Sequence, residues 1–191
     1  MSTGESSEPG PQSVTGPRIN KGLVIVNTGN GKGKTTAAMG VLFRAWGRDF
    51  KVIMLQFIKH STANFGEQRA AKKIGVEMRA MGDGFTWDTQ DRAQDIASTR
   101  RAGDEVKRMI ADPSYAMVVA DELNIVLRYD YLPLSDVLEA LAAKPAMTHV
   151  VITGRNAPEG LIAVADLVTE MGLVKHPFRE QGVKAQAGVE F

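Results

Sequence analysis

Apolar runs and amphipathic stretches alternate along most of the chain. Continuous apolar runs of four to seven residues are typical of strands buried on both faces, and they cover 23–28, 52–58, 76–81, 117–120, 150–153 and 167–171. Between them, helical patterns cover 34–46, 66–74, 89–111, 134–142 and 158–165. Strands that alternate with helices predict a mainly parallel sheet with helices on both faces. Such α/β sheets bind ligands beyond the carboxyl ends of their strands, so we expect the functional residues directly after the apolar runs.

The first 17 residues differ from the rest. They are rich in Ser, Gly and Pro and contain no apolar core. Such a segment buries too little surface to offset its ordering entropy, and it does not have the pattern of a signal peptide. We expect a flexible segment over 1–17, either a plain tail or an arm that orders over a bound ligand, followed by a single domain over 18–191.

Composition excludes several function classes. The 191 residues carry 23 basic and 22 acidic side chains, so no global field predicts nucleic-acid or membrane-surface binding. No apolar stretch is long enough to span a membrane. The absence of cysteine rules out disulfides, thiolate metal sites and catalytic thiols, and it is consistent with a cytoplasmic protein.

A glycine-rich turn follows the first apolar run. The phosphate-loop pattern is Gly, four residues, Gly, Lys, then Ser or Thr, and Gly33, Lys34 and Thr35 supply its end. The first glycine is offset by one, since Thr28 stands at its position with Gly29 beside it. Glycines permit positive φ and a close approach of backbone N–H groups to anionic oxygens. The following helix N-terminus adds its dipole.

The side chains of this loop complete a nucleotide site. Lys34 can reach the phosphates, Lys32 adds a second positive charge, and the Thr35 hydroxyl can ligate Mg²⁺. We assign ATP binding to the loop and the start of its helix: Gly29, Asn30, Gly31, Lys32, Gly33, Lys34, Thr35 and Thr36.

Two carboxylates end the fourth apolar run. Asp121 and Glu122 follow MVVA, the arrangement that brings an acidic side chain beside the phosphate loop to hold Mg²⁺ directly or through water. If the strand persists through both, they point to opposite sides and only one touches the metal. No general base is marked elsewhere, since none of the three histidines has metal-ligand spacing and no nucleophile elbow is present. An acceptor without a proton would remove the need for a base.

The stretch MGDGFTWDTQD follows the third apolar run. Phe85 and Trp87 stand two apart in a segment hinged by Gly82 and Gly84. They form either an apolar lid or platform for a large ring, or ordinary packing of a loop onto the core.

From about residue 18 to 191 the chain resembles the P-loop-type ATP:cob(I)alamin adenosyltransferases, the corrinoid adenosyltransferases. The resemblance is carried by KGLVIVNTGNGKGKTTAA, QFIK, GFTWDTQD, DELNIVLRYDYLPL, ITGRNAPEGLIAVADLVTEM and the tail VKHPFREQGVKAQAGVEF. The combination of GFTW, DELN and ADLVTEM is far more specific than a phosphate loop alone. His60 after QFIK and Asn156 after ITGR stand where the family usually has glycine.

The resemblance implies the fold and the reaction. It implies a RecA-like P-loop domain in which the Co(I) centre of a corrinoid attacks C5′ of ATP and releases inorganic triphosphate. It further implies Thr35 and Glu122 at Mg²⁺, Arg44 near the nucleotide, Phe85 and Trp87 at the corrinoid, a homodimer, and a reductase that supplies electrons for Co(I). Lys34, Phe85 and Trp87 are then the candidate catalytic residues. Two other functions stay open on the residues: a P-loop kinase or ATPase, and a non-catalytic nucleotide-dependent corrinoid-binding module.

Overall fold

A six-stranded parallel sheet organises the protein. The computed structural model describes residues 19–60, 65–82 and 92–190. Within them the strands are ordered β3-β2-β4-β5-β1-β6, and every neighbouring pair is parallel. The strands are β1 (Val24–Thr28), β2 (Val52–His60), β3 (Glu77–Gly82), β4 (Met117–Asp121), β5 (His149–Thr153) and β6 (Leu167–Glu170).

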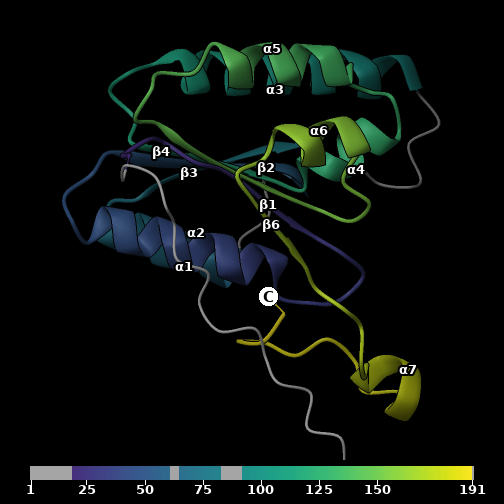
Figure 1. Cartoon of the computed structure of the whole chain (residues 1–191). Helices are drawn as coiled ribbons and strands as arrows, with labels where there is room; N and C mark the ends of the chain where they lie inside the picture. Colours follow the sequence, from purple (N-terminus) through teal and green to yellow (C-terminus); the bar gives the residue numbers. More distant parts are fainter. Residues whose placement is uncertain (1–18, 61–64, 83–91, 191) are drawn as a thin grey trace, which may run out of the picture.

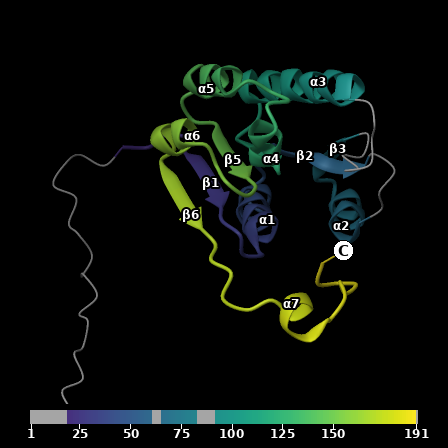
Figure 2. The ribbon, with the colours of Figure 1, turned by 90° about the vertical axis from the view of Figure 1, so that its right-hand side faces the viewer.

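Helices cover both faces of the sheet (Figures 1 and 2). One face carries α1 (Lys34–Trp46) and α2 (Gly66–Ile74), and the other carries the helix pair α3 (Arg92–Ala111) and α5 (Leu134–Ala142) together with α4 (Leu123–Arg128) and α6 (Glu159–Val164). A last short helix, α7 (Pro177–Gln181), lies beyond β6.

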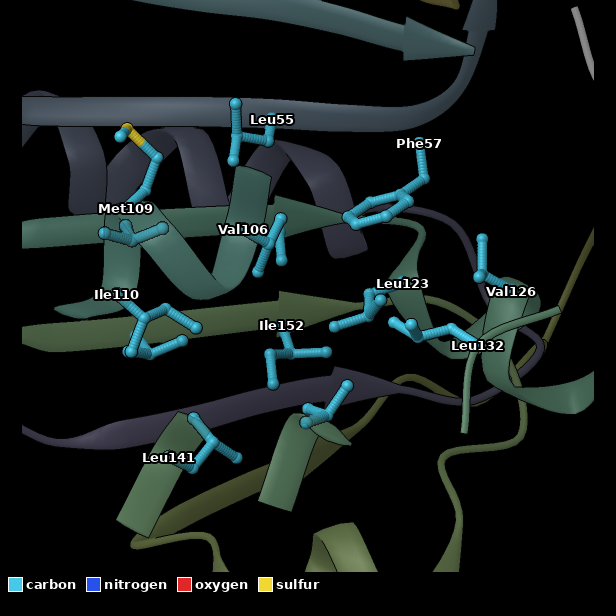
Figure 3. Close-up of a cluster of buried hydrophobic side chains, with 14 of the residues drawn as sticks. Leu55, Phe57, Val106, Met109, Ile110, Leu123, Val126, Leu132, Leu141 and Ile152 are labelled. Atoms are coloured by element: carbon cyan, nitrogen blue, oxygen red, sulfur yellow. The ribbon is translucent and has the colours of Figure 1, made fainter. Parts of the chain in front are cut away.

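The alternation of side chains along the strands divides the core into two layers. In β4, Val118 and Ala120 pack under α3 to α6, whereas Met117 and Val119 pack toward α1 and α2. Figure 3 shows the first layer, where Leu55 and Phe57 of β2 meet side chains of α3 and α4. Strands inside a parallel sheet are buried on both faces, so β1, β4 and β5 read as continuous apolar runs. The buried strand predicted over 167–171 is wrong in one respect: β6 forms there, but it lies at the edge of the sheet and its four residues are exposed.

The structure confirms the predicted fold class, and α1, α2 and α5 have the bounds that the sequence predicts. Two short helices, α4 and α7, were not predicted. They have six and five residues, too few for a 3.6-residue periodicity to show in the sequence. The predicted tail over 1–17 lies outside the described residues, and its boundary with the domain stays a prediction.

His149 is a structural residue. Its Nδ1 accepts a hydrogen bond from the backbone N–H of Leu23 at 3.0 Å, so the ring ties the start of β1 to the start of β5. Burial and the nearby Lys144 lower the pKa of His149, which keeps the imidazole neutral.

Candidate functional site

The glycine-rich turn between β1 and α1 owes its shape to two different constraints. Gly29 and Gly33 have φ of 94° and 105°, in the left-handed region that favours glycine. Gly31 is needed for space instead: a Cβ on it would lie 2.5 Å from the carbonyl oxygen of Gly172. The backbone after β6 therefore lies against the loop, and the N–H of Gly31 donates to the carbonyl of Met171 at 2.7 Å.

Lys34 is buried within the loop. Its Nζ donates hydrogen bonds to the carbonyls of Gly29 at 2.9 Å and Gly31 at 2.5 Å. Burial lowers the pKa of the Lys34 ammonium, while Glu122 acts in the opposite direction. In the described structure, the only hydrogen-bond acceptors of the Lys34 ammonium are these two neutral backbone carbonyls. An anionic ligand would therefore compensate the burial of its charge better than they do.

Thr28 occupies the position of the missing first glycine. Its Oγ1 accepts a hydrogen bond from the backbone N–H of Ala157 at 3.1 Å and so links β1 to the segment after β5. That segment turns sharply, since Gly154 has a φ of 128° and Asn156 a φ of 54°. Asn156, which stands where the family usually has glycine, thus adopts a left-handed conformation, and asparagine tolerates it better than most residues.

Asp121, the last residue of β4, is fully enclosed by hydrogen-bond donors. Its Oδ1 accepts from the hydroxyls of Thr35 at 2.8 Å and Thr153 at 2.7 Å, and its Oδ2 accepts from the amide of Gln56 at 3.3 Å. Asp121 is 1% exposed. It therefore holds together β4, β5, β2 and the start of α1, and it orients the Thr35 hydroxyl.

Glu122 is placed quite differently from its neighbour. The strand ends at Asp121, and Glu122 adopts a left-handed φ of 63° at the start of α4, with its N–H donating to Thr153 Oγ1 at 2.9 Å. Its Oε2 is buried without a hydrogen-bond partner among the described residues. Burial, reinforced by Asp121, raises the pKa of this carboxyl. A non-glycine residue in this conformation stores strain that is characteristic of functional sites.

These elements surround a pocket of about 730 Å³ between α1, α2 and the carboxyl ends of the central strands. Seven of the predicted residues line it: Gly31, Lys32, Gly33, Lys34, Thr35, Thr36 and Glu122. Gly29, Asn30 and Asp121 adjoin it through the loop and the hydrogen bonds above. Arg44 is exposed on α1 and is not among the lining residues, so its role stays a prediction. Phe85 and Trp87 lie outside the described residues.

Sequence reasoning missed several lining residues. Lys59 near the end of β2, Glu67 of α2 and Arg155 after β5 all line the pocket. Lys59 and Arg155 belong to the QFIK and ITGR motifs, and both follow apolar runs, so the strand-end rule could have found them. Glu67 carried no comparable signal.

The C-terminal segment also reaches this pocket. Gly188, Val189 and Glu190 line it, and Glu190 Oε2 pairs with Lys32 Nζ at 2.6 Å. In Figures 1 and 2 the chain beyond α7 returns toward α1 and α2. Nothing in the local sequence of the tail predicts this contact, because it joins residues 158 positions apart.

The residues present suit a magnesium ion. Mg²⁺ is usually bound by one or two protein oxygens together with substrate phosphates. Glu122 offers a buried oxygen without a partner, and Thr35 offers a hydroxyl beside the phosphate loop. Among the residues that the structure describes, no three acidic or histidine side chains form a complete metal cage, and none of the helices could cross a bilayer.

The described structure is an α/β protein whose six-stranded parallel sheet, flanked by helices, is consistent with a RecA-like P-loop fold. The family ATP:corrinoid adenosyltransferase BtuR/CobO/CobP matches residues 20–191, and the chain belongs to that family.

Relatives named corrinoid adenosyltransferase are similar over nearly the whole length. The protein from Sinorhizobium sp. is 52% identical, over 90% of this chain and 81% of the relative. The protein from Pseudomonas aeruginosa is 47% identical, over 94% of this chain and 89% of the relative. The protein from Escherichia coli is 48% identical, over 90% of this chain and 86% of the relative.

Proposed function

We propose that this protein is an ATP:corrinoid adenosyltransferase that moves the 5′-deoxyadenosyl group of ATP to the Co(I) centre of a corrinoid. Membership of the family carries the proposal. The pocket supports it, since a buried lysine, a second lysine and loop amides line one cavity with Glu122, whose buried Oε2 has no hydrogen-bond partner among the described residues.

The reaction is a displacement at carbon. The electron pair of Co(I) forms the cobalt–carbon bond, the bond between C5′ and the phosphate oxygen breaks, and its electrons leave with inorganic triphosphate. Co(I) carries no proton, so no general base is required. The remaining tasks are to align the two substrates and to stabilise the negative charge that develops on the leaving group.

The residues of this chain suit those tasks. Lys34, Lys32 and the loop amides would bind the triphosphate, with the dipole of α1 acting in the same direction. Thr35 and Glu122 would hold Mg²⁺, with Asp121 orienting Thr35. When bound, the ion neutralises charge on the departing triphosphate. The alternative of a kinase or ATPase is not favoured, and neither is a non-catalytic binding module.

The corrinoid side of the site rests on the resemblance. We infer that Phe85 and Trp87 fill the lower face of the corrin and exclude its axial ligand and water. Loss of an axial donor lowers the energy of the cobalt orbital that receives the electron, so reduction from Co(II) becomes easier. The electrons would come from a separate reductase. We also infer a cytoplasmic homodimer, which light scattering of the purified protein would test.

The deciding experiment identifies both products. The protein is incubated with ATP, Mg²⁺ and chemically reduced corrinoid, and we expect triphosphate and a light-sensitive alkylcobalt species in equal amounts. ADP formed at a comparable rate without corrinoid would instead identify an ATPase. Unchanged ATP in the presence of bound corrinoid would identify a binding module.

The aromatic pair has its own test. Changing Phe85 and Trp87 together to Ala should slow the reaction that starts from Co(II) and spare much of the reaction that starts from Co(I). Wild type with ATP should give the spectrum of four-coordinate Co(II), and the variant that of the five-coordinate form. Equal losses from both starting states, with the four-coordinate signal retained, would restrict the two rings to packing.

A further inference from the structure

Lys59 brings a positive charge into the pocket from outside the phosphate loop. It stands near the carboxyl end of β2, whereas Lys32 lies in the β1–α1 turn and Lys34 begins α1. The pairing of β2 with β3 shifts register between Gln56 and His60, an irregularity of the kind that re-aims side chains near active sites. The Lys59 side chain is 24% exposed and lines the pocket.

The charges that act on Glu122 include the Lys59 ammonium. Three cations, Lys34, Arg155 and Lys59, favour the ionised form of this carboxyl, although burial and Asp121 outweigh them and raise its pKa. These cations come from three different parts of the sheet edge: Lys34 begins α1 after β1, Arg155 follows β5, and Lys59 lies near the end of β2. Burial lowers the pKa of Lys59 despite the opposing influence of Asp121 and Glu122. The Lys59 ammonium therefore lies close enough to Asp121 and Glu122 to interact with both carboxylates.

The partners of Lys59 belong to the wall opposite α1. Its ammonium pairs with Glu67, in the first turn of α2, and lies 4.4 Å from the centre of the Phe65 ring. Glu67 itself lines the pocket. The Lys59–Glu67 pair thus stands at the surface that a ligand in the pocket would touch.

We propose that Lys59 is a third phosphate-binding lysine besides Lys32 and Lys34, and that it exchanges Glu67 for the triphosphate group when the substrate enters. The inference rests on the proposed function and extends it to a residue outside the phosphate loop. An ammonium on a flexible four-carbon stem can move from one anion to another without rearrangement of the backbone. Lys59 and the loop would then hold the triphosphate from opposite walls and stabilise the charge that grows as it leaves.

A purely structural role makes a different prediction. If the Lys59–Glu67 pair only fastens α2 to β2, losing either partner should have the same small effect, because partly exposed ion pairs contribute little to stability. If Lys59 binds phosphate, the two losses should act in opposite directions on anion affinity.

The first test compares Lys59→Met with Lys51→Met. Lys51 stands just before β2, at its opposite end, and its Nζ lies 4.0 Å from the centre of the Tyr115 ring. The control therefore loses the same charge and a similar cation–π contact away from the pocket. The affinity for inorganic triphosphate with Mg²⁺, measured by calorimetry, should fall about ten-fold or more in Lys59→Met and stay unchanged in Lys51→Met.

The kinetics add a readout that a structural tie would not move. With chemically reduced corrinoid, kcat of Lys59→Met should fall by about 10²-fold, more than KM for ATP changes. Lys59→Arg should recover most of the loss, since it keeps the charge. Glu67→Gln should bind triphosphate more tightly than wild type, because the competing carboxylate is gone.

Two results would overturn the inference: folded Lys59→Met with wild-type triphosphate affinity, or equal weakening by Lys59→Met and Glu67→Gln. The proposed function fails separately, if wild type releases no triphosphate with Co(I) corrinoid. If wild type releases triphosphate and Lys59→Met keeps the wild-type triphosphate affinity, the proposed function stands and only the role of Lys59 is rejected.

Discussion

At the residue scale, adjacent side chains in the site have separate tasks. Asp121 and Glu122 are neighbours in the sequence, yet Asp121 has both oxygens engaged by protein donors and Glu122 has a buried oxygen without one. The left-handed backbone of Glu122 causes the difference, because it turns the second carboxylate away from the direction that a continuing strand would give it.

Removing Lys34 should reduce catalysis more than it reduces stability. The Lys34→Ala protein loses a preorganised charge aimed at the departing triphosphate, a change that commonly lowers rates by about 10²–10³-fold. Steady-state kinetics at saturating ATP measures this. Near-normal kcat would mean that the loop does not carry the phosphates.

The two carboxylates should differ when each is neutralised. Glu122→Gln should need about ten-fold or more Mg²⁺ for half-maximal activity, without losing stability in metal-free buffer, because a buried carboxylate beside Asp121 is removed. Asp121→Asn should unfold at lower denaturant, because an amide cannot accept all the hydrogen bonds that the carboxylate accepts. Titration of activity with Mg²⁺ and urea unfolding provide the comparison. An unchanged Mg²⁺ requirement for Glu122→Gln would contradict its assignment as a ligand.

His149 should make stability depend on pH. Its pKa is lowered on folding, so above the unfolded value of about 6.5 the ring is neutral in both states and its contribution is complete. Below that pH the unfolded chain takes up the proton first, and stability is lost as pH falls toward the folded pKa. His149→Asn keeps an acceptor for Leu23 but does not titrate. Between pH 7.5 and 5.5, urea unfolding should therefore show a larger loss for wild type than for the variant, and parallel curves would refute the assignment.

At the scale of elements, the phosphate loop depends on the segment that follows β6. The close approach of residues 170–172 to Gly29 and Gly31 means that the last strand supports a loop formed by the first. This arrangement follows from the strand order, in which β6 pairs with β1 at the edge of the sheet.

Two glycine-to-alanine changes should therefore have opposite effects on stability. Gly31→Ala should destabilise by about 1–3 kcal/mol, because its Cβ would overlap backbone atoms of Met171 and Gly172. Gly40→Ala should stabilise by up to about 1 kcal/mol, because it lies inside α1 with no atom within 4 Å of the added Cβ. Thermal and urea unfolding of both variants measures this. A Gly31→Ala protein as stable as wild type would show that the backbone at residues 171–172 moves aside at little cost.

At the scale of the whole molecule, the pocket is assembled from both ends of the described chain. The phosphate loop lies near the beginning and Gly188 to Glu190 near the end, and the ion pair of Lys32 with Glu190 joins them. A carboxylate at this place would compete with phosphate for Lys32, so we expect the tail to influence how readily a nucleotide enters.

Neutralising Glu190 should tighten ATP binding. Glu190→Gln should lower the Kd for ATP with Mg²⁺ several-fold in low salt, and less in high salt, because charge interactions near the surface are screened. Stability should change by no more than about 0.5 kcal/mol. Glu180→Gln is the matched control, since Glu180 lies in α7 and accepts from the His176 N–H. Weaker binding by Glu190→Gln would show that the tail supports the ligand instead of competing with it.

The sequence by itself determined the α/β class, the six strands and the glycine-rich turn after the first of them, because these depend on local periodicity and on residues close together in the chain. It also placed Thr35 and Glu122 near each other through the strand-end rule, together with the resemblance. It did not predict α4 and α7, because these helices contain too few residues for a helical periodicity to show.

Only the tertiary structure decided which side chains share the pocket. Val24–Thr28 pairs with both β5 and β6, and no local pattern encodes that order. Contacts between distant segments explain why position 31 needs glycine and why Asp121 and Glu122 have different surroundings. They also bring Lys59 and Glu190 to the same pocket as the loop. Such contacts depend on how the sheet is assembled, because burial and electrostatics act through space and not along the chain.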